Sequence, residues 1–299
     1  MQNQMKQKQL HTKQKKPVRS ISGVTPLAVV IKPRPCPHGS CIYCPTLGVP
    51  KSYTPESPAI IRARQLNYDA YKQVKARLKI LKLMKHQTDK IELIIIGGTF
   101  LAYPIQYQYN FIKRCYDDFN CKKAKTLEEA KTINENAKHR DEALCIETRP
   151  DYAKQQHIKH MLDFGTTRVE LGVQTIYNNI YRLINRGHTL KEVIEATRLL
   201  KDSGFKLGYH IMPGLPGSNI KKDIAMFKKL FNDERFRPDQ LKIYPTQVIK
   251  GSILEQWYWQ GKYKPYSKQE LIELLTRYYA LTPRYCRIMR VMREIPKQW

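Results

Sequence analysis

The chain has 299 residues, enough for one barrel-sized domain or two smaller ones, and it carries 53 Lys and Arg against 26 Asp and Glu, a formal net charge of +27. This surplus makes a polyanion, and above all a nucleic acid, the natural partner; a membrane is not expected, because no apolar run approaches the roughly 20 residues of a spanning helix and no signal-peptide core stands near the start. Seven cysteines, three of them within nine residues, fit metal ligation in a reducing compartment better than a secreted disulfide framework, so we expect a cytoplasmic protein.

Residues 1–20 form a basic segment that contains no acid and many glutamines. Such a composition cannot build a core, so we expect a disordered arm. Its candidate phosphate contacts for a nucleic acid are Lys13, Lys15, Lys16 and Arg19. The alternative is a solvated tail without a function.

A β-rich run at 27–31 leads into a loop that reads Cys36-Pro-His-Gly-Ser-Cys41-Ile-Tyr-Cys44, a C-x4-C-x2-C pattern. Three thiolates in one loop can hold an iron–sulfur cluster in which one iron stays open to a substrate or cofactor. Three alternatives remain. A distant cysteine can close a ferredoxin-type cluster, His38 can complete a zinc site, or the cysteines can be buried without a ligand. The distant cysteines are Cys115, Cys121, Cys145 and Cys286.

Strands and helices alternate along the rest of the chain. The further predicted strands are 91–96, 143–147, 168–174, 206–212 and 240–244, and the predicted helices are 58–85, 106–119, 153–164, 190–203, 218–232 and 268–280. The lysine-rich stretch 120–140 reads as an exposed insertion, and 287–293 as a possible edge strand. Six strand–helix units predict a parallel sheet, either an incomplete α/β barrel or an open doubly wound sheet, with reactive groups at the carboxyl ends of the strands.

Glycines and polar residues gather at those strand ends. They are Gly97, Gly98 and Thr99 after the second strand, Glu147 on the third, Glu170 and Gln174 on the fourth, His210 and Met212 on the fifth, and Lys242 and Tyr244 on the sixth. Alternation along a strand gives Glu170 and Gln174 one shared face, and likewise Lys242 and Tyr244. Each of these residues also has a purely structural interpretation. The glycines can form a tight turn, the glutamates can form ion pairs with neighbouring arginines, and His210 can be a core histidine. Lys242 and Tyr244 can lie on a solvated strand edge.

Seven motifs, in this order, resemble the radical S-adenosylmethionine (SAM) domain of the Elongator catalytic subunit family, whose members modify the wobble uridine of tRNA. They are Cys36-Pro-His-Gly-Ser-Cys41-Ile-Tyr-Cys44-Pro45, Ile96-Gly-Gly-Thr-Phe100, Glu147-Thr-Arg-Pro-Asp151, Arg168-Val-Glu-Leu-Gly-Val-Gln174, Asn185-Arg-Gly-His-Thr189, His210-Ile-Met-Pro213 and Leu241-Lys-Ile-Tyr-Pro-Thr246. The resemblance covers roughly residues 20–299. The first cysteine gap is one residue longer than the commonest radical SAM spacing, a lengthening that this family is known to show.

The resemblance implies an α/β fold, a partial (β/α)6 TIM-like barrel of the radical SAM type over residues 21–299 with a C-terminal extension. It implies a 4Fe–4S cluster on Cys36, Cys41 and Cys44, with SAM at the open iron. The expected cofactor-binding residues are Gly97, Gly98, Thr99, Glu147, Glu170, Gln174, His210 and Met212. Lys242 and Tyr244 are the candidate catalytic residues, because their side chains share a face that can reach the active cavity.

Similar enzymes cleave SAM, take a hydrogen from the methyl group of acetyl-CoA and attach the acetyl carbon to carbon 5 of uridine 34, which ends as carboxymethyl-uridine. The chain is therefore expected to be a tRNA-modifying enzyme of the acyltransferase class, with acetyl-CoA as co-substrate and an external electron donor. The family's acetyltransferase domain is not expected within these residues, so a separate acetyltransferase chain is an expected partner. Arg287 and Arg290 are further candidate RNA contacts. Two alternative functions stay open, a catalytically silent tRNA-binding scaffold and an iron–sulfur electron carrier. A homodimer is also possible from the sequence.

Overall fold

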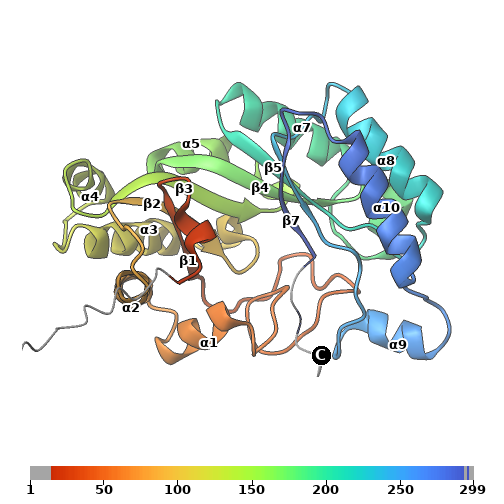
Figure 1. Ribbon diagram of the computed structural model, residues 1–299, viewed down its shortest axis with the longest axis horizontal. Helices are drawn as coiled ribbons and strands as arrows, with labels where there is room; N and C mark the ends of the chain where they lie inside the picture. The colour runs from red at the N-terminus through yellow and green to blue at the C-terminus, as the bar shows by residue number, and fades with distance from the viewer. Residues whose placement is uncertain (1–14, 293–294, 296–299) are drawn as a thin grey trace, which may run out of the picture.

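A seven-stranded, all-parallel sheet organises residues 15–292 and residue 295, the part of the chain that the computed structural model describes (Figure 1). Its strands lie side by side in chain order. They are β1 (Thr25–Val30), β2 (Lys90–Ile96), β3 (Arg140–Thr148), β4 (Thr166–Gln174), β5 (Lys206–Ile211), β6 (Gln240–Ile243) and β7 (Arg287–Val291). The sheet curls into an incomplete barrel with β1 and β7 at its two edges, which confirms the predicted fold class. The strand β7 also confirms the edge strand predicted over 287–293.

Ten α-helices in the described residues join and cover the strands. They are α1 (Pro58–Gln65), α2 (Ala70–Leu83), α3 (Ile105–Phe119), α4 (Leu127–Asn134), α5 (Gln155–Phe164), α6 (Asn178–Leu183), α7 (Leu190–Asp202), α8 (Ile220–Asn232), α9 (Ile253–Trp259) and α10 (Lys268–Leu281). The single helix predicted over 58–85 is wrong. Asn67 and Tyr68 have φ angles of 51° and 55°, which end α1, and the Asp69 side chain then caps α2 by accepting the Lys72 amide hydrogen.

The stretch predicted as an exposed insertion is also wrong in part. It contains α4, whose Leu127, Ala130 and Asn134 are buried. The Asn134 amide side chain donates to the His139 carbonyl and accepts from the Asp141 backbone amide, which ties the stretch to the start of β3. Of the lysines in this stretch, Lys131 alone lies on α4, where it is half-buried, and the others are exposed on either side of the helix. The lysine-rich composition therefore did not reveal the helix.

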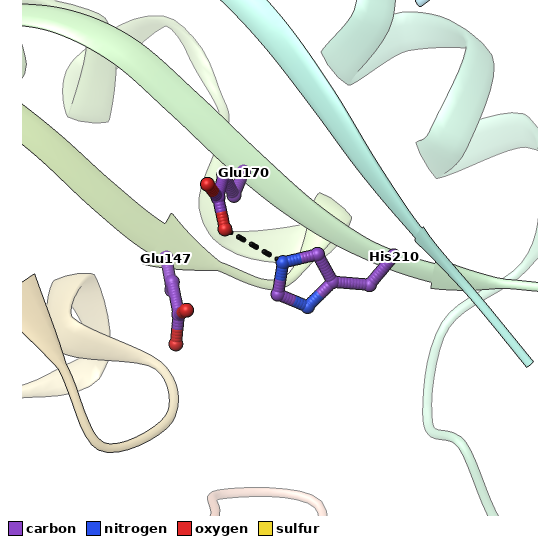
Figure 2. A group of neighbouring side chains, drawn as sticks. All are labelled: Glu147, Glu170 and His210. Atoms are coloured by element: carbon purple, nitrogen blue, oxygen red, sulfur yellow. Dashed lines mark hydrogen bonds and ion pairs between the residues drawn. The ribbon is translucent and has the colours of Figure 1, made fainter. Parts of the chain in front are cut away.

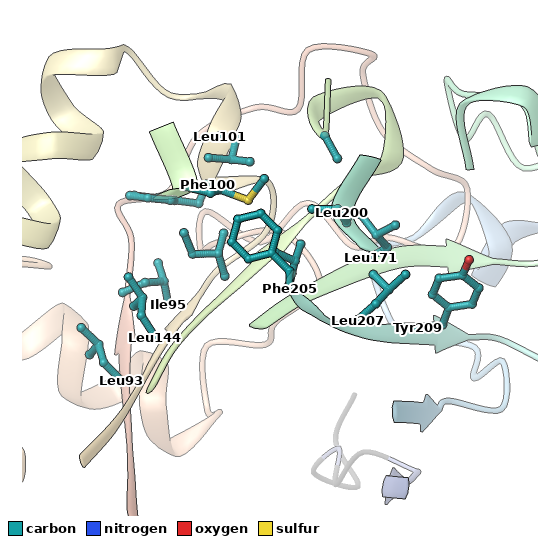
Figure 3. Close-up of a cluster of buried hydrophobic side chains, with 14 of the residues drawn as sticks. Leu93, Ile95, Phe100, Leu101, Leu144, Leu171, Leu200, Phe205, Leu207 and Tyr209 are labelled. Atoms are coloured by element: carbon teal, nitrogen blue, oxygen red, sulfur yellow. The ribbon is translucent and has the colours of Figure 1, made fainter. Parts of the chain in front are cut away.

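The apolar side chains of the strands point outward and pack beneath the helices. Figure 3 shows this layer, in which alternate residues of neighbouring strands meet Phe100 and Leu101 from the turn after β2, and Leu200 from α7. The strand residues labelled there are Leu93, Ile95, Leu144, Leu171, Leu207 and Tyr209. Because side chains alternate along a strand, the residues between them face the inside of the partial barrel, and many of these are polar. The inner face is therefore available for chemistry.

The basic segment at the start of the chain lies mostly outside the described residues, which begin at residue 15 and so leave out Lys13. Pro17–Ser20 forms a short 3-10 helix, η1, which contacts β1. The Ser20 hydroxyl hydrogen-bonds to Nδ1 of His86 at 2.7 Å. Among the described helices, none is long and apolar enough to span a membrane.

Asp141, at the start of β3, gives the fold a specific pH dependence. Burial, reinforced by Glu92 and Glu142, raises the pKa of Asp141 to about 7, although hydrogen bonds from Tyr116 and the Leu93 amide oppose the shift. The folded state therefore holds a proton that the unfolded chain releases near pH 4, so the free energy of unfolding should fall as the pH rises from about 4 to 7.

Asp141→Asn should flatten this part of the profile, measured by urea unfolding at a series of pH values. Glu135→Gln, an exposed change at the end of α4 that removes a carboxylate away from Asp141, is the matched control and should leave the slope in place. An unchanged slope in the Asp141 variant would contradict the assignment.

Candidate active site

The three clustered cysteines lie in the loop that follows β1, at the carboxyl end of the sheet. Cys41 is buried and Cys36 and Cys44 are half-buried. Two backbone hydrogen bonds shape the loop, from the Gly39 amide to the Cys36 carbonyl at 3.0 Å and from the Cys44 amide to the Cys41 carbonyl at 2.9 Å. One compact loop therefore presents all three thiols, as the spacing predicts.

The other four cysteines are placed differently. Cys115 and Cys286 belong to the apolar core outside the sheet, and Cys121 is exposed beyond α3. Cys145 lies in the middle of β3, where Arg168 and Glu170 are its neighbours. The buried core positions of Cys115 and Cys286, the exposed position of Cys121 and the mid-strand position of Cys145 give the ferredoxin-type alternative no support.

A zinc site is likewise not formed. Zinc–sulfur bonds of 2.3 Å would bring ligand sulfurs to about 3.8 Å from one another. Among the described residues, the only group of three or more His, Cys, Asp or Glu whose ligand atoms all lie within 4.8 Å is Glu147, Glu170 and His210. The three cysteines and His38 are therefore spread more widely than one zinc ion requires. An iron–sulfur cluster, in which each of three irons binds one thiolate, suits this wider separation of the sulfur atoms.

Glu147, Glu170 and His210 lie together on the inner face of β3, β4 and β5 (Figure 2) and form the core of what we call the inner-face group. Glu147 and Glu170 are paired neighbours in the sheet, and His210 Nε2 lies 2.7 Å from Glu170 Oε2. Lys242, paired with His210 in the next strand, forms an ion pair with Glu147 at 3.3 Å and a closer one with Glu170. The structure thus brings together four of the residues that the sequence singled out.

The charges in this group are fixed by their mutual contacts. Burial alone would raise the pKa of Glu170, but the hydrogen bond with His210 and the charges of Lys242 and Arg168 hold that pKa far below its usual range. Burial would lower the pKa of Lys242, but Glu147 and Glu170 raise it well above its usual value. The Lys242 ammonium therefore takes the place that a divalent cation would occupy between the carboxylates, and it is a charged donor rather than a base.

Tyr244 completes the inner-face group. Its ring meets that of His210 edge-on, with centroids 5.5 Å apart, and burial raises the pKa of its phenol. The phenol is therefore neutral and able to donate a hydrogen bond.

The glycine turn after β2 lies against the start of the cysteine loop. Gly97 has a φ of 126°, and a Cβ there would come within 2.7 Å of Ile31 Cγ1. Gly98, with a φ of 114°, has only Lys51 Cβ at 3.8 Å in that direction, and Thr99 is buried. Close packing against Ile31 explains why residue 97 is a glycine. The absence of a side chain at Gly98, by contrast, leaves open space beside the cysteine loop.

Gln174 and Met212 lie near the ends of β4 and β5. Gln174 has a left-handed φ of 70°, and its backbone carbonyl accepts a hydrogen bond from the Met212 amide at 2.9 Å. The Met212 side chain packs against an apolar cluster that includes Ile42 of the cysteine loop and Leu215. Met212 thus adjoins the cysteine loop, and Gln174 adjoins Met212.

Several buried polar atoms around the loop and the ends of β3 and β4 have no hydrogen-bond partner in the described residues. They are His38 Nδ1, Thr148 Oγ1, Arg149 Nη1 and Gln174 Oε1. Leaving such atoms unsatisfied is costly, so they point to a polar ligand. The residues present therefore fit a thiolate-bound cluster with a polar cofactor beside it.

The candidate RNA contacts are spread over the molecule. Lys15, Lys16 and Arg19 lie at the amino end of β1, opposite the cysteine loop, whereas Arg287 and Arg290 are exposed on the edge strand β7. Arg290 pairs with Lys242 in the sheet. The structure thus brings Arg290 close to the inner-face group and leaves the amino-terminal residues away from it.

Sequence reasoning selected no residue of the 185–189 motif for the site. Arg186 is buried, and its guanidinium donates to Cys41 Sγ at 3.6 Å and to Nε2 of His188 at 3.1 Å. The only sequence signal for a role of Arg186 was that the Asn185-Arg-Gly-His-Thr189 motif resembles one of the family. Without that resemblance, its glycine indicates only an ordinary helix end.

Comparison with known proteins agrees with this geometry. Residues 30–230 match the family model of the radical SAM superfamily, and residues 238–299 match the radical SAM C-terminal domain. A tRNA uridine(34) acetyltransferase of Dehalococcoides mccartyi is 58% identical over 283 residues, which are 94% of this chain and 61% of the relative. Elongator complex protein 3 of Homo sapiens is 42% identical over 294 residues, 94% of this chain and 53% of that protein.

Solved structures extend the comparison. The Elp3 structure from the archaeon Methanocaldococcus infernus aligns with a TM-score of 0.79 at 46% identity, over 92% of this chain and 57% of that one. Coproporphyrinogen III oxidase from Escherichia coli, a radical SAM enzyme, aligns with a TM-score of 0.53 at 19% identity and shares the fold alone. The chain spans between 52% and 61% of the length of the proteins named here.

Proposed function

The chain belongs to the radical SAM superfamily, and we propose that it modifies the wobble uridine of tRNA, with acetyl-CoA as the source of a carboxymethyl group on carbon 5. The observation that carries the proposal is the position of the three-cysteine loop at the same end of the sheet as the group of Glu147, Glu170, His210 and Lys242. The names of the relatives, tRNA uridine(34) acetyltransferase and Elongator complex protein 3, supply the substrate class.

We assign the cofactors as follows. Cys36, Cys41 and Cys44 would hold a 4Fe–4S cluster, and residues at the neighbouring strand ends would hold SAM. When bound, the reduced cluster and SAM together supply one-electron chemistry that no side chain offers. The residues proposed to bind SAM are Gly97, Gly98, Thr99, Glu147, Glu170, Gln174, His210 and Met212. Gly98, which leaves space beside the loop, and Gln174, with its unsatisfied buried oxygen, support this assignment most directly.

Lys242 and Tyr244 are assigned to the substrate. The ammonium of Lys242 is held between two carboxylates, so its position is fixed before a substrate arrives. A fixed cation and a neutral phenol suit the carbonyl oxygens of an acetyl group or of uracil. We propose that these two side chains hold and polarise those oxygens while the partial barrel excludes water.

The RNA partner is supported by charge. The net charge of +27 favours a polyanion, and phosphate contacts from arginine and lysine usually dominate affinity for nucleic acids. Arg290 and Arg287, on the exposed edge nearest the inner-face group, are the contacts we favour for the anticodon loop. Lys15, Lys16 and Arg19 would contact a more distant part of the same tRNA.

The first experiment is anaerobic reconstitution of the cluster, followed by electron paramagnetic resonance of the dithionite-reduced protein with and without SAM. A spectrum that SAM perturbs, together with release of 5′-deoxyadenosine, is the expected result. A cluster that ignores SAM would favour the electron carrier. A protein that binds tRNA but holds no cluster would favour the scaffold.

A further inference from the structure

Two loops far apart in sequence are fitted closely against each other at the cysteine site. The Ile42 amide donates to the Ile184 carbonyl at 3.1 Å, and the Asn185 side-chain amide donates to the Ser40 carbonyl at 3.0 Å. Gly187 has a φ of 75°, and a Cβ there would come within 2.5 Å of His38 Cβ. The segment after α6 therefore forms one wall of the cysteine loop.

Arg186 is the buried charge at the centre of this contact. Its side chain donates from Nη1 to Cys41 Sγ at 3.6 Å, from Nε to His188 Nε2 at 3.1 Å, and from Nη2 to the Gly172 carbonyl. Within residues 15–292, no Asp or Glu forms an ion pair with it. A buried guanidinium without a carboxylate is costly, and an anionic sulfur is a natural partner for it.

The backbone at Gly172 lies directly against the Arg186 guanidinium and leaves no room for a side chain. A Cβ on Gly172 would lie 2.5 Å from Arg186 Nη2, a distance that no real Cβ contact allows. Gly172 is on β4, two residues from both Glu170 and Gln174. Arg186 therefore contacts both Cys41 and β4, the strand that carries Glu170.

We propose that Arg186 is a positioning residue for Cys41, and that its positive charge raises the reduction potential of the cluster held by the three cysteines. Hydrogen bonds and positive charge at a ligand sulfur stabilise the reduced cluster, which carries one more negative charge than the oxidised one. One electron enters from an external low-potential donor, and no proton moves at Arg186, because a guanidinium stays protonated. The inference rests on the proposed function only for the presence of the cluster.

The test is a redox titration of the reconstituted full chain, with dithionite as the reductant and electron paramagnetic resonance as the readout. Arg186→Gln should lower the equilibrium constant for reduction by about tenfold, which is about 59 mV for a one-electron couple. Arg186→Lys should show a smaller shift, because it keeps the charge but loses the planar fork. Gly172→Ala should shift the potential in the same direction, since its methyl group displaces Nη2.

The matched control is Arg182→Gln, which removes an exposed arginine from the same helix–loop segment and should leave the potential unchanged. Iron content and circular dichroism are measured for every variant. If Arg186→Gln folds but loses iron, its role in positioning Cys41 is supported, and Arg186→Lys and Gly172→Ala decide the effect on the potential. Wild-type potentials and spectra in all three variants would overturn the inference alone, whereas a wild-type chain without a cluster would overturn the proposed function as well.

Discussion

Cys41→Ala is expected to lower the rate of 5′-deoxyadenosine release by more than about a hundredfold, the upper end of the loss seen when a supporting residue around a metal is removed. Cys41 is the most buried of the three cysteines, and it alone has hydrogen-bond contacts with both His38 and Arg186. In the proposed assignment, its loss leaves two thiolates for a cluster that needs three. The measurement is iron per chain together with chromatography of the nucleoside product, with dithionite as the electron source.

Cys121→Ala is the control for Cys41→Ala. Cys121 is exposed beyond α3, so its loss removes a thiol without touching the cysteine loop or the core. Iron content and product should stay at the wild-type level. Full iron and normal SAM cleavage in the Cys41 variant would show that the cluster lies elsewhere.

Lys242→Met should cost about 3–5 kcal/mol of unfolding free energy and abolish tRNA modification. The change leaves the buried Glu170 carboxylate without its closest cation, and breaking a buried pair from one side carries a penalty of this size. The same change removes the donor that we assign to the substrate. Urea unfolding at pH 7 gives the first quantity, and mass spectrometry of the wobble uridine, with acetyl-CoA, SAM and the expected acetyltransferase partner supplied, gives the second.

A double variant separates the two roles of Lys242. Lys242→Met combined with Glu170→Gln removes both charges of the pair, so most of the lost stability should return. Modification should not return, because the double variant lacks both the Lys242 donor and the Glu170 carboxylate assigned to SAM, so the recovered stability is the quantity that tests the ion pair. Modified tRNA from the double variant would show that Lys242 serves only to neutralise Glu170.

The fold could be predicted from the sequence largely because its strands are short apolar runs bounded by glycine, proline or polar residues. The break between α1 and α2 could not, since Asn67 and Tyr68 carry no glycine or proline signal for their left-handed backbone. Asn67 and Asp69 did carry a weaker local signal, because Asn tolerates a left-handed backbone and Asp is a preferred N-cap, but the helical pattern on both sides outweighed it.

The site could be predicted only in part, because local pattern shows which residues stand at strand ends but not which of them touch. The cysteine spacing pointed directly to a metal site. The ion pairs of Lys242 join residues 95 and 72 positions away, and the contact of Arg186 with Cys41 spans 145 positions. Contacts over such separations leave no trace in spacing or periodicity.

The order of the strands also bears on how the protein is made. Because β1 to β7 lie side by side in the order of synthesis, the sheet can grow strand by strand as the chain leaves the ribosome. The cysteine loop emerges early, yet the arginine that meets Cys41 is synthesised 145 residues later. Until the segment after α6 has folded, the nascent cysteine loop lacks its contacts with Asn185 and Arg186, so the three thiols are more accessible than in the completed fold.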